Sequence, residues 1–184
     1  MQRLSGVLWC ERELLGDLVY RLEQERSVLA DGRTRWLPRA AREVDEVLET
    51  LRETELLRAV TSDEAASDLG LAANPSLRAL AVAASGPWPT ILLDHRDAFL
   101  SHVREVSELA VINDELLGTW ASEDRGTATA ARPAGPACSG TARRRQNPAP
   151  ASQVVVAQLQ QAAYLSARAA TGHVVQPSLL EFLR

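Results

Sequence analysis

The sequence predicts an all-α fold, in which an elongated antiparallel helical hairpin and a third long helix form a coiled-coil-like bundle of three helices. The first observation is a run of leucines from Leu4 to Leu29 that recur at steps of three, four or seven residues. This is the period of a helical face and not of a strand. The second is a seam from Phe99 to Trp120 whose steps alternate between four and three, as in a coiled coil. We expect the third helix to close on the hairpin, because otherwise the hairpin keeps a long apolar groove uncovered.

The hairpin follows from the short turn between the first two helices. Asp31 and Gly32 end the first run, since Gly suits the left-handed conformation that often follows a helix C-terminus. Thr34 offers an N-cap oxygen, and Pro38 is tolerated in the first turn of the second helix. Apolar residues then recur on one helical face, and this helix is expected to finish at Arg58. A connection of about four residues makes the two helices antiparallel neighbours.

Short elements are expected between the hairpin and the third helix. Ser62, followed by two acidic residues, is a good N-cap for a separate short helix that stops at Gly70. A Gly-Pro-Trp-Pro corner then precedes a third long helix, predicted over residues 88–120. The seam of this helix contains one polar residue, Asn113. A lone Asn on such a seam costs some stability and commonly fixes register or partner choice.

Composition divides the chain into three parts. Residues 1–120 are the predicted helical bundle, and residues 121–152 are rich in Ala, Pro, Gly and Arg without an apolar period. Such a segment cannot bury enough surface to offset its ordering entropy, so it is predicted to be a disordered linker. Residues 153–184 are predicted to form a C-terminal helix and an apolar tail, in which Ser178 and Glu181 have capping-box spacing. The sequence leaves open whether this tail docks on the bundle or on a partner.

Charge, hydropathy and cysteine content exclude several classes of protein. The chain carries a net charge of -4, but residues 125–184 hold seven arginines and a single acidic residue. Nucleic-acid binding is not expected, because the arginine cluster has no interleaved aromatic residues and the preceding bundle is acidic. No apolar run approaches the roughly 20 residues of a membrane span, and charged residues interrupt any signal peptide. Two cysteines form no disulfide framework, so a reduced, cytoplasmic protein is expected.

No catalytic, cofactor or metal site is expected either. The sequence has no phosphate-binding loop and no nucleophile elbow. His95 and His102 are seven residues apart, whereas metal ligands on one helix usually lie three or four apart. Acidic residues are explained as solvated faces, except that Glu11 and Glu25 fall on the apolar seam of the first helix. We therefore predict that the protein is not an enzyme and needs no cofactor or metal.

The order and content of the helices resemble FlgN-type flagellar export chaperones, especially those of high-GC Gram-positive bacteria. The resemblance covers about residues 4–120. Two features depart from the family pattern: Ala110 stands where the third helix often has an additional Asn, and residues 121–141 contain no Tyr. The segments that carry the resemblance are Leu22-Glu23-Gln24-Glu25, Leu29-Ala30-Asp31-Gly32-Arg33, residues 52–60, residues 92–100 and Leu109-Ala110-Val111-Ile112-Asn113-Asp114-Glu115-Leu116-Leu117.

The resemblance implies a cytoplasmic chaperone that binds hook–filament junction (hook-associated) proteins by their terminal helices and passes them to the flagellar type III export apparatus. A client helix captured in a groove uses apolar anchors at i, i+3, i+4 and i+7. A weak homodimer is compatible with this role. The alternative is a structural adaptor in which the coiled-coil helices form a tight homodimer without chaperone activity. Most of the candidates on the third helix are at least as well explained as residues of the bundle core. The candidate client-binding residues are Phe99, Val103, Val106, Asn113, Leu117, Leu179, Leu180 and Phe182.

Overall fold

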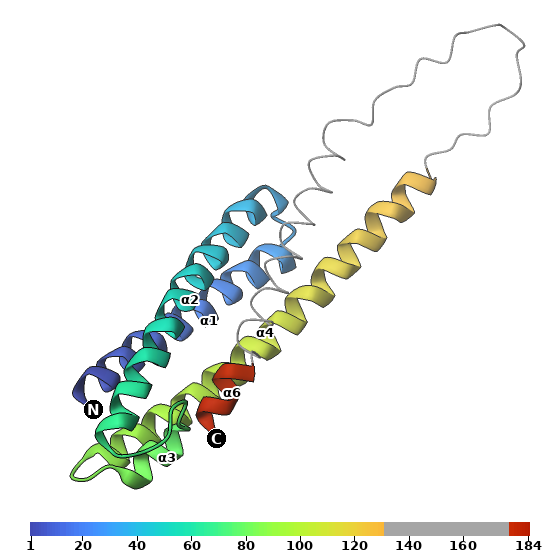
Figure 1. Cartoon of the computed structure of the whole chain (residues 1–184). Coiled ribbons are helices and arrows are strands. Elements are labelled where there is room, and N and C mark those ends of the chain that lie inside the picture. The colour runs from blue at the N-terminus through green and yellow to red at the C-terminus, as the bar shows by residue number, and fades with distance from the viewer. Residues whose placement is uncertain (131–176) are drawn as a thin grey trace, which may run out of the picture.

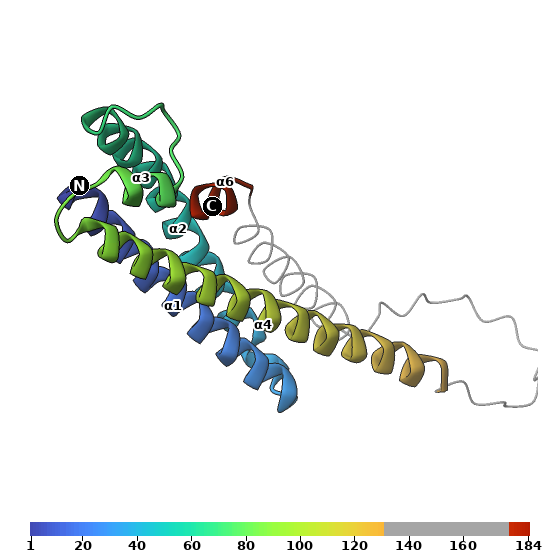
Figure 2. The same ribbon diagram turned by 90° about the horizontal axis from the view of Figure 1, so that it is seen from below.

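The computed structural model describes residues 1–130 and 177–184. Within them the secondary structure is helical and contains no strand, which confirms the predicted all-α fold. Helix α1 lies between the other two long helices and packs along both of them (Figures 1 and 2). The elements are α1 (Gln2–Ala30), the 3-10 helix η1 (Thr34–Trp36), α2 (Leu37–Asp68), α3 (Leu77–Ala83), α4 (Trp88–Ala130) and α6 (Pro177–Leu183).

The turn that makes the hairpin is built as its sequence predicts. Gly32 has a φ of 71°, a conformation that costs a residue with a Cβ atom but not glycine. Its N–H donates to the carbonyl of Leu29 at 3.1 Å, and the N–H of Arg33 donates to the carbonyl of Val28 at 3.0 Å. These two hydrogen bonds satisfy carbonyls that the end of α1 leaves free. The chain therefore reverses direction, and α2 returns along α1 (Figure 1).

The predicted break between Arg58 and Ser62 is wrong. Helix α2 continues without interruption to Asp68, and Gly70, whose φ is 71°, follows its C-cap residue Leu69. Ser62 is buried inside the helix and caps nothing. Helix propagation adds a hydrogen bond for each residue that it orders. The helix also buries Ala65 and Ala66 in the core beyond the predicted break, and this packing outweighs the capping tendency of Ser62.

The third long helix begins at Trp88, as predicted, but runs to Ala130 instead of residue 120. The first ten residues of the expected linker are therefore helical. Alanine and the hydrogen bonds of an existing helix favour such an extension. The remainder of the expected linker and the helix expected after residue 153 lie outside the described residues.

The C-terminal tail docks on the bundle, which answers the question that the sequence left open. Helix α6 lies beside α3 and α4 (Figure 2). Its residues Leu179, Phe182 and Leu183 are 2%, 6% and 2% exposed. These residues are spaced i, i+3 and i+4, so they form one face of the short helix. They join the main hydrophobic core of α1, α2, α3 and α4.

The main core lies where α1 meets the other helices. The predicted leucine seam of α1 is buried throughout, from Leu4 to Leu29. A smaller apolar cluster near the hairpin turn contains Leu29, Leu37 and Leu117. The two seams read from the sequence therefore bury each other within one chain, as the three-helix bundle requires.

Candidate functional site: the surface that holds the C-terminal helix

The structure buries seven of the eight candidate client-binding residues. Phe99, Val103 and Val106 lie on α4 in the same hydrophobic cluster as Leu179 and Phe182 of α6. Leu117 lies in the smaller cluster near the hairpin turn. Asn113 is fully buried, and Leu180 is 37% exposed. The structure therefore brings five of these residues into one cluster and places the other three elsewhere.

Helix α6 is held by two arginines that the sequence analysis did not identify. The guanidinium carbon of Arg58 on α2 lies 4.5 Å from the centroid of the Phe182 ring, a cation–π contact. Arg96 on α4 donates from Nε to the carbonyl of Leu183 at 2.7 Å. That carbonyl is at the C-terminal end of α6, where a positive charge is favourable and the helix itself offers no donor. Both arginines therefore place a positive charge at the C-terminal end of α6, beside its buried apolar residues.

Arg58 also forms a buried ion pair beneath α6. Its Nε lies 2.9 Å from Oε2 of Glu11 on α1, and the two side chains are 6% and 1% exposed. Burial raises the pKa of Glu11 to about 7, against the opposing effect of Arg58, and the nearby carboxylate of Glu55 raises it further. Arg58 therefore joins α1, α2 and α6 at one point. Breaking such a pair on one side leaves a charge without its partner in a poorly solvated place.

A hollow of about 240 Å³ adjoins Phe182 at the surface. Glu55, Leu56 and Ala59 of α2 line one side, and Asn74 lines it from the turn before α3. Leu56, which lines this hollow, is 72% exposed. The surface next to α6 therefore has free apolar area and room for a further side chain.

Asn113 has its hydrogen-bond partners inside the bundle. Its Nδ2 donates to the carbonyl of Leu22 at 3.1 Å and to Oε2 of Glu25 at 3.0 Å. Both Asn113 and Glu25 are completely buried. Burial raises the pKa of Glu25 to about 7, while the hydrogen bond from Asn113 lowers it and the charge of Asp45 raises it. The polar seam residue therefore fixes how α4 sits against α1.

The sequence carried a signal for the buried ionic residues. Glu11 and Glu25 fall on the apolar seam of α1. On α2, Glu55 and Arg58 follow Leu48 and Leu51 at steps of four and three, so they lie on the same helical face as these leucines. A charged residue on an apolar seam predicts a buried partner. Which residues pair across the helices depends on their register, which the sequence does not give.

The described residues contain no group of three His, Cys, Asp or Glu side chains that would hold a metal ion. His102 lies against Gly16 of α1 and 3.8 Å from a carboxylate oxygen of Glu105. His95 packs against Trp9 of α1. No helix in the described part of the chain is both long enough and apolar enough to cross a bilayer.

Fold and site together define a small helical-bundle protein whose surface accepts a short amphipathic helix. The family model described as FlgN protein matches residues 1–119. The chain therefore belongs to the FlgN family of flagellar export chaperones. No match was found among the curated proteins or among the solved structures. The family match ends at residue 119, so α6 lies beyond the matched region, whereas Arg58 and Arg96, which hold it, lie within that region.

Proposed function

We propose that this protein is a cytoplasmic export chaperone that binds the terminal helices of hook–filament junction proteins before flagellar type III export. The observation that supports this most directly is the docking of α6. The bundle surface already holds a short helix by an apolar face spaced i, i+3 and i+4, the spacing by which grooves capture amphipathic helices. Family membership supports the flagellar export role in general.

We place the client helix on the surface that α6 occupies. The apolar cluster that contains Phe99, Val103 and Val106 would form its floor. The exposed side chain of Leu56 lies beside this surface, at the hollow next to Phe182, whereas Leu180 belongs to α6 and leaves with it. Leu179 and Phe182 enter the proposal as the residues that a client helix must displace, since both are buried against the bundle.

Asn113 and Leu117 have a different part in the proposal. Asn113 is committed to Leu22 and Glu25, and Leu117 packs with Leu29 and Leu37. We infer that these residues keep the bundle closed and that the client does not contact them. Clients bound by displacement of α6 leave these contacts intact.

The test is co-expression with each hook–filament junction protein of the same organism, followed by size-exclusion chromatography with light scattering. We expect a stoichiometric complex with at least one of them. The variant L179S/F182S removes the two apolar anchors of α6 and is expected to bind this client at least about 10-fold more tightly, because a smaller part of the population has the surface covered. A substitution of the exposed Leu93 on α4 is the control and leaves affinity unchanged.

Two results would overturn the proposal. If no junction protein co-elutes and the chain forms a tight homodimer, the structural adaptor is the better description. If a client binds but L179S/F182S leaves its affinity unchanged or weaker, the client does not use the α6 surface.

A further inference from the structure

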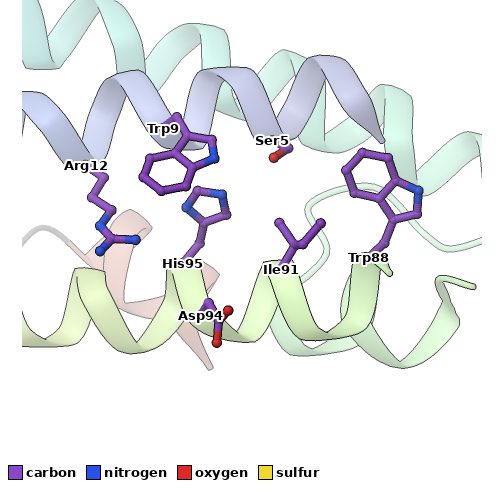
Figure 3. Close-up of a pocket in the computed structure, with 7 residues that line it drawn as sticks. All are labelled: Ser5, Trp9, Arg12, Trp88, Ile91, Asp94 and His95. Atoms are coloured by element: carbon purple, nitrogen blue, oxygen red, sulfur yellow. The ribbon is translucent and has the colours of Figure 1, made fainter. Parts of the chain in front are cut away.

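A second hollow, of about 370 Å³, lies between the first half of α1 and the first turns of α4 (Figure 3). All its lining residues come from these two helices, and none belongs to α6. Trp9 of α1 and Trp88 of α4 flank the hollow, with Ile91 between them (Figure 3). It is therefore a different surface from the one that holds the C-terminal helix.

The walls of this hollow are aromatic and unusually exposed. Trp9 is 49% exposed, and Trp88 and Ile91 are only partly buried. Tryptophan side chains provide large apolar contact area at little conformational cost and are enriched in the centres of protein interfaces. Two of them around one hollow form a slot for an apolar side chain.

His95 places an unsatisfied polar group in the hollow. The residue is 1% exposed, and neither ring nitrogen has a hydrogen-bond partner among the described residues. Its ring meets the indole of Trp9 edge-on, with centroids 5.0 Å apart. Burial and then the charge of Arg12 lower its pKa, against a smaller opposing effect of Asp94. The neutral ring therefore offers one donor and one acceptor, and a buried group of this kind is costly until a partner satisfies it.

Arg12 supplies a positive charge at one end of the hollow. Its guanidinium carbon lies 5.0 Å from the centroid of the Trp9 indole, and it forms no salt bridge within residues 1–130 and 177–184. Asp94 also lines the hollow, but Figure 3 shows its side chain on the side of α4 that is turned away from α1. The end of the hollow formed by Arg12 and Trp9 therefore favours an anion.

We propose that this hollow binds an amphipathic helix of a partner protein, which inserts a bulky apolar side chain between Trp9 and Trp88 and pairs a carboxylate one turn away with Arg12 and the donor nitrogen of His95. Trp88, Ile91 and His95 follow each other on α4 at i, i+3 and i+7. A helix laid beside this row meets it with its own residues at the same spacing. The proposal goes beyond client capture and does not depend on it, since it uses none of the residues that hold α6.

The experiment uses the full chain and roughly 16-residue alanine- and glutamine-based helical peptides with a fluorescent label. One peptide carries Phe and Glu at i and i+4, the second replaces Glu by Gln, and the third replaces Phe by Ala. Fluorescence anisotropy is expected to show binding of the Phe/Glu peptide, about 10-fold weaker binding of the Phe/Gln peptide, and no binding of the third. NMR of the tryptophan side chains is expected to show shifts of the Trp9 and Trp88 indole N–H signals, while that of Trp36 stays unchanged.

Two variants and a control separate the contacts. R12Q removes the cation without breaking a salt bridge and is expected to bind the Phe/Glu and Phe/Gln peptides equally. I91D puts a charge between the two indoles and is expected to abolish binding. R26Q alters an exposed arginine elsewhere on α1 and is expected to change nothing. Circular dichroism confirms that each variant keeps the helical fold.

Several outcomes would overturn the proposal. Equal binding of all three peptides would show that the hollow recognises neither the phenylalanine nor the carboxylate. An unchanged preference for glutamate in R12Q would show that Arg12 does not bind the carboxylate. Tighter peptide binding by L179S/F182S, which uncovers the α6 surface, would assign the peptides to that surface. Self-association of the chain that I91D removes, without peptide binding, would make a second copy the occupant. A junction protein can still co-elute in each case, so failure here leaves the client test standing.

Discussion

Arg58 is the residue whose loss is expected to affect this structure most, because three helices depend on it. The substitution R58A removes the partner of Glu11, which is 1% exposed and lies 2.9 Å away. It also removes the cation above the ring of Phe182. Removing one member of a buried ion pair typically costs about 3–5 kcal/mol of unfolding free energy. We expect a cost in this range at neutral pH.

The cost of R58A depends on pH because Glu11 can take up a proton. Arg58 lowers the pKa of Glu11, which burial raises from 4.5 to about 7, so its removal raises that pKa further. A carboxyl group whose pKa is raised on folding contributes less stability as the pH rises from its unfolded pKa to its folded pKa. The cost of R58A is therefore expected to grow above about pH 7 by roughly 1.4 kcal/mol per pH unit. At about pH 5–6 it is smaller, because Glu11 is mostly protonated in both proteins.

Urea unfolding followed by circular dichroism, at about pH 6 and about pH 8, measures both effects. R52A is the matched control, because Arg52 pairs with Glu49 at 2.7 Å on the exposed side of the same helix and such pairs are worth about 0–1 kcal/mol. The double variant E11M/R58M is expected to regain most of the lost stability, since apolar side chains replace both charges. The reasoning is refuted if R58A costs no more than R52A, or if its cost is the same at both pH values.

Three further predictions concern other parts of the fold. E25Q replaces the carboxyl group of a fully buried residue by a neutral amide, whereas the pKa of Glu25 in the folded wild type is about 7. As the pH rises from about 4.5 to about 7, the wild type should therefore lose on the order of 3 kcal/mol of unfolding free energy relative to E25Q. A pH-independent difference between the two proteins in urea unfolding would contradict this. N113A leaves Glu25 without its hydrogen-bond donor and is expected to cost about 1–3 kcal/mol, measured in the same way, while an effect of a few tenths would show that the contact does not set the position of α4. G70A forces alanine to a φ of 71° and is expected to cost about 1 kcal/mol. An added Cβ at Gly6, within α1, meets nothing within 4 Å, so G6A is expected to stabilise the protein by about 0.5–1 kcal/mol. G70A should therefore lower the melting temperature and G6A should raise it; shifts in the same direction would contradict this prediction.

Residues with local or periodic signals were predictable from the sequence. The seam of α1 from Leu4 to Leu29, the turn at Gly32 and the start of α4 at Trp88 are all found where expected. Each depends on the helical period or on the backbone preference of one residue, and both are properties of the chain itself. The break expected at Ser62 failed because a capping preference of about 1 kcal/mol is smaller than the gain from burying the next helical turns.

The candidate site was only partly predictable. Apolar residues of α4 and α6 were recognised as a group by their spacing and hydrophobicity, and the structure brings Phe99, Val103 and Phe182 into one cluster. Arg58 and Arg96, which hold α6 in place, were missed. Leu183 was missed as well, although it is as buried as Leu179. Contacts between residues far apart in the chain depend on helix register and crossing geometry, and periodicity alone does not specify either.

The sequence by itself determined that this chain forms long amphipathic helices, that the first two reverse at Gly32, and that a polar residue interrupts the seam of the third helix. It did so because helix formation and chain reversal depend on residues that are neighbours along the chain. Only the tertiary structure decided that α6 returns to the bundle, that Glu11 meets Arg58 beneath it, and that Trp9, Trp88 and His95 surround one hollow. These contacts join helices that are far apart in the sequence, and their free energy comes from burial that exists only after the helices have packed together.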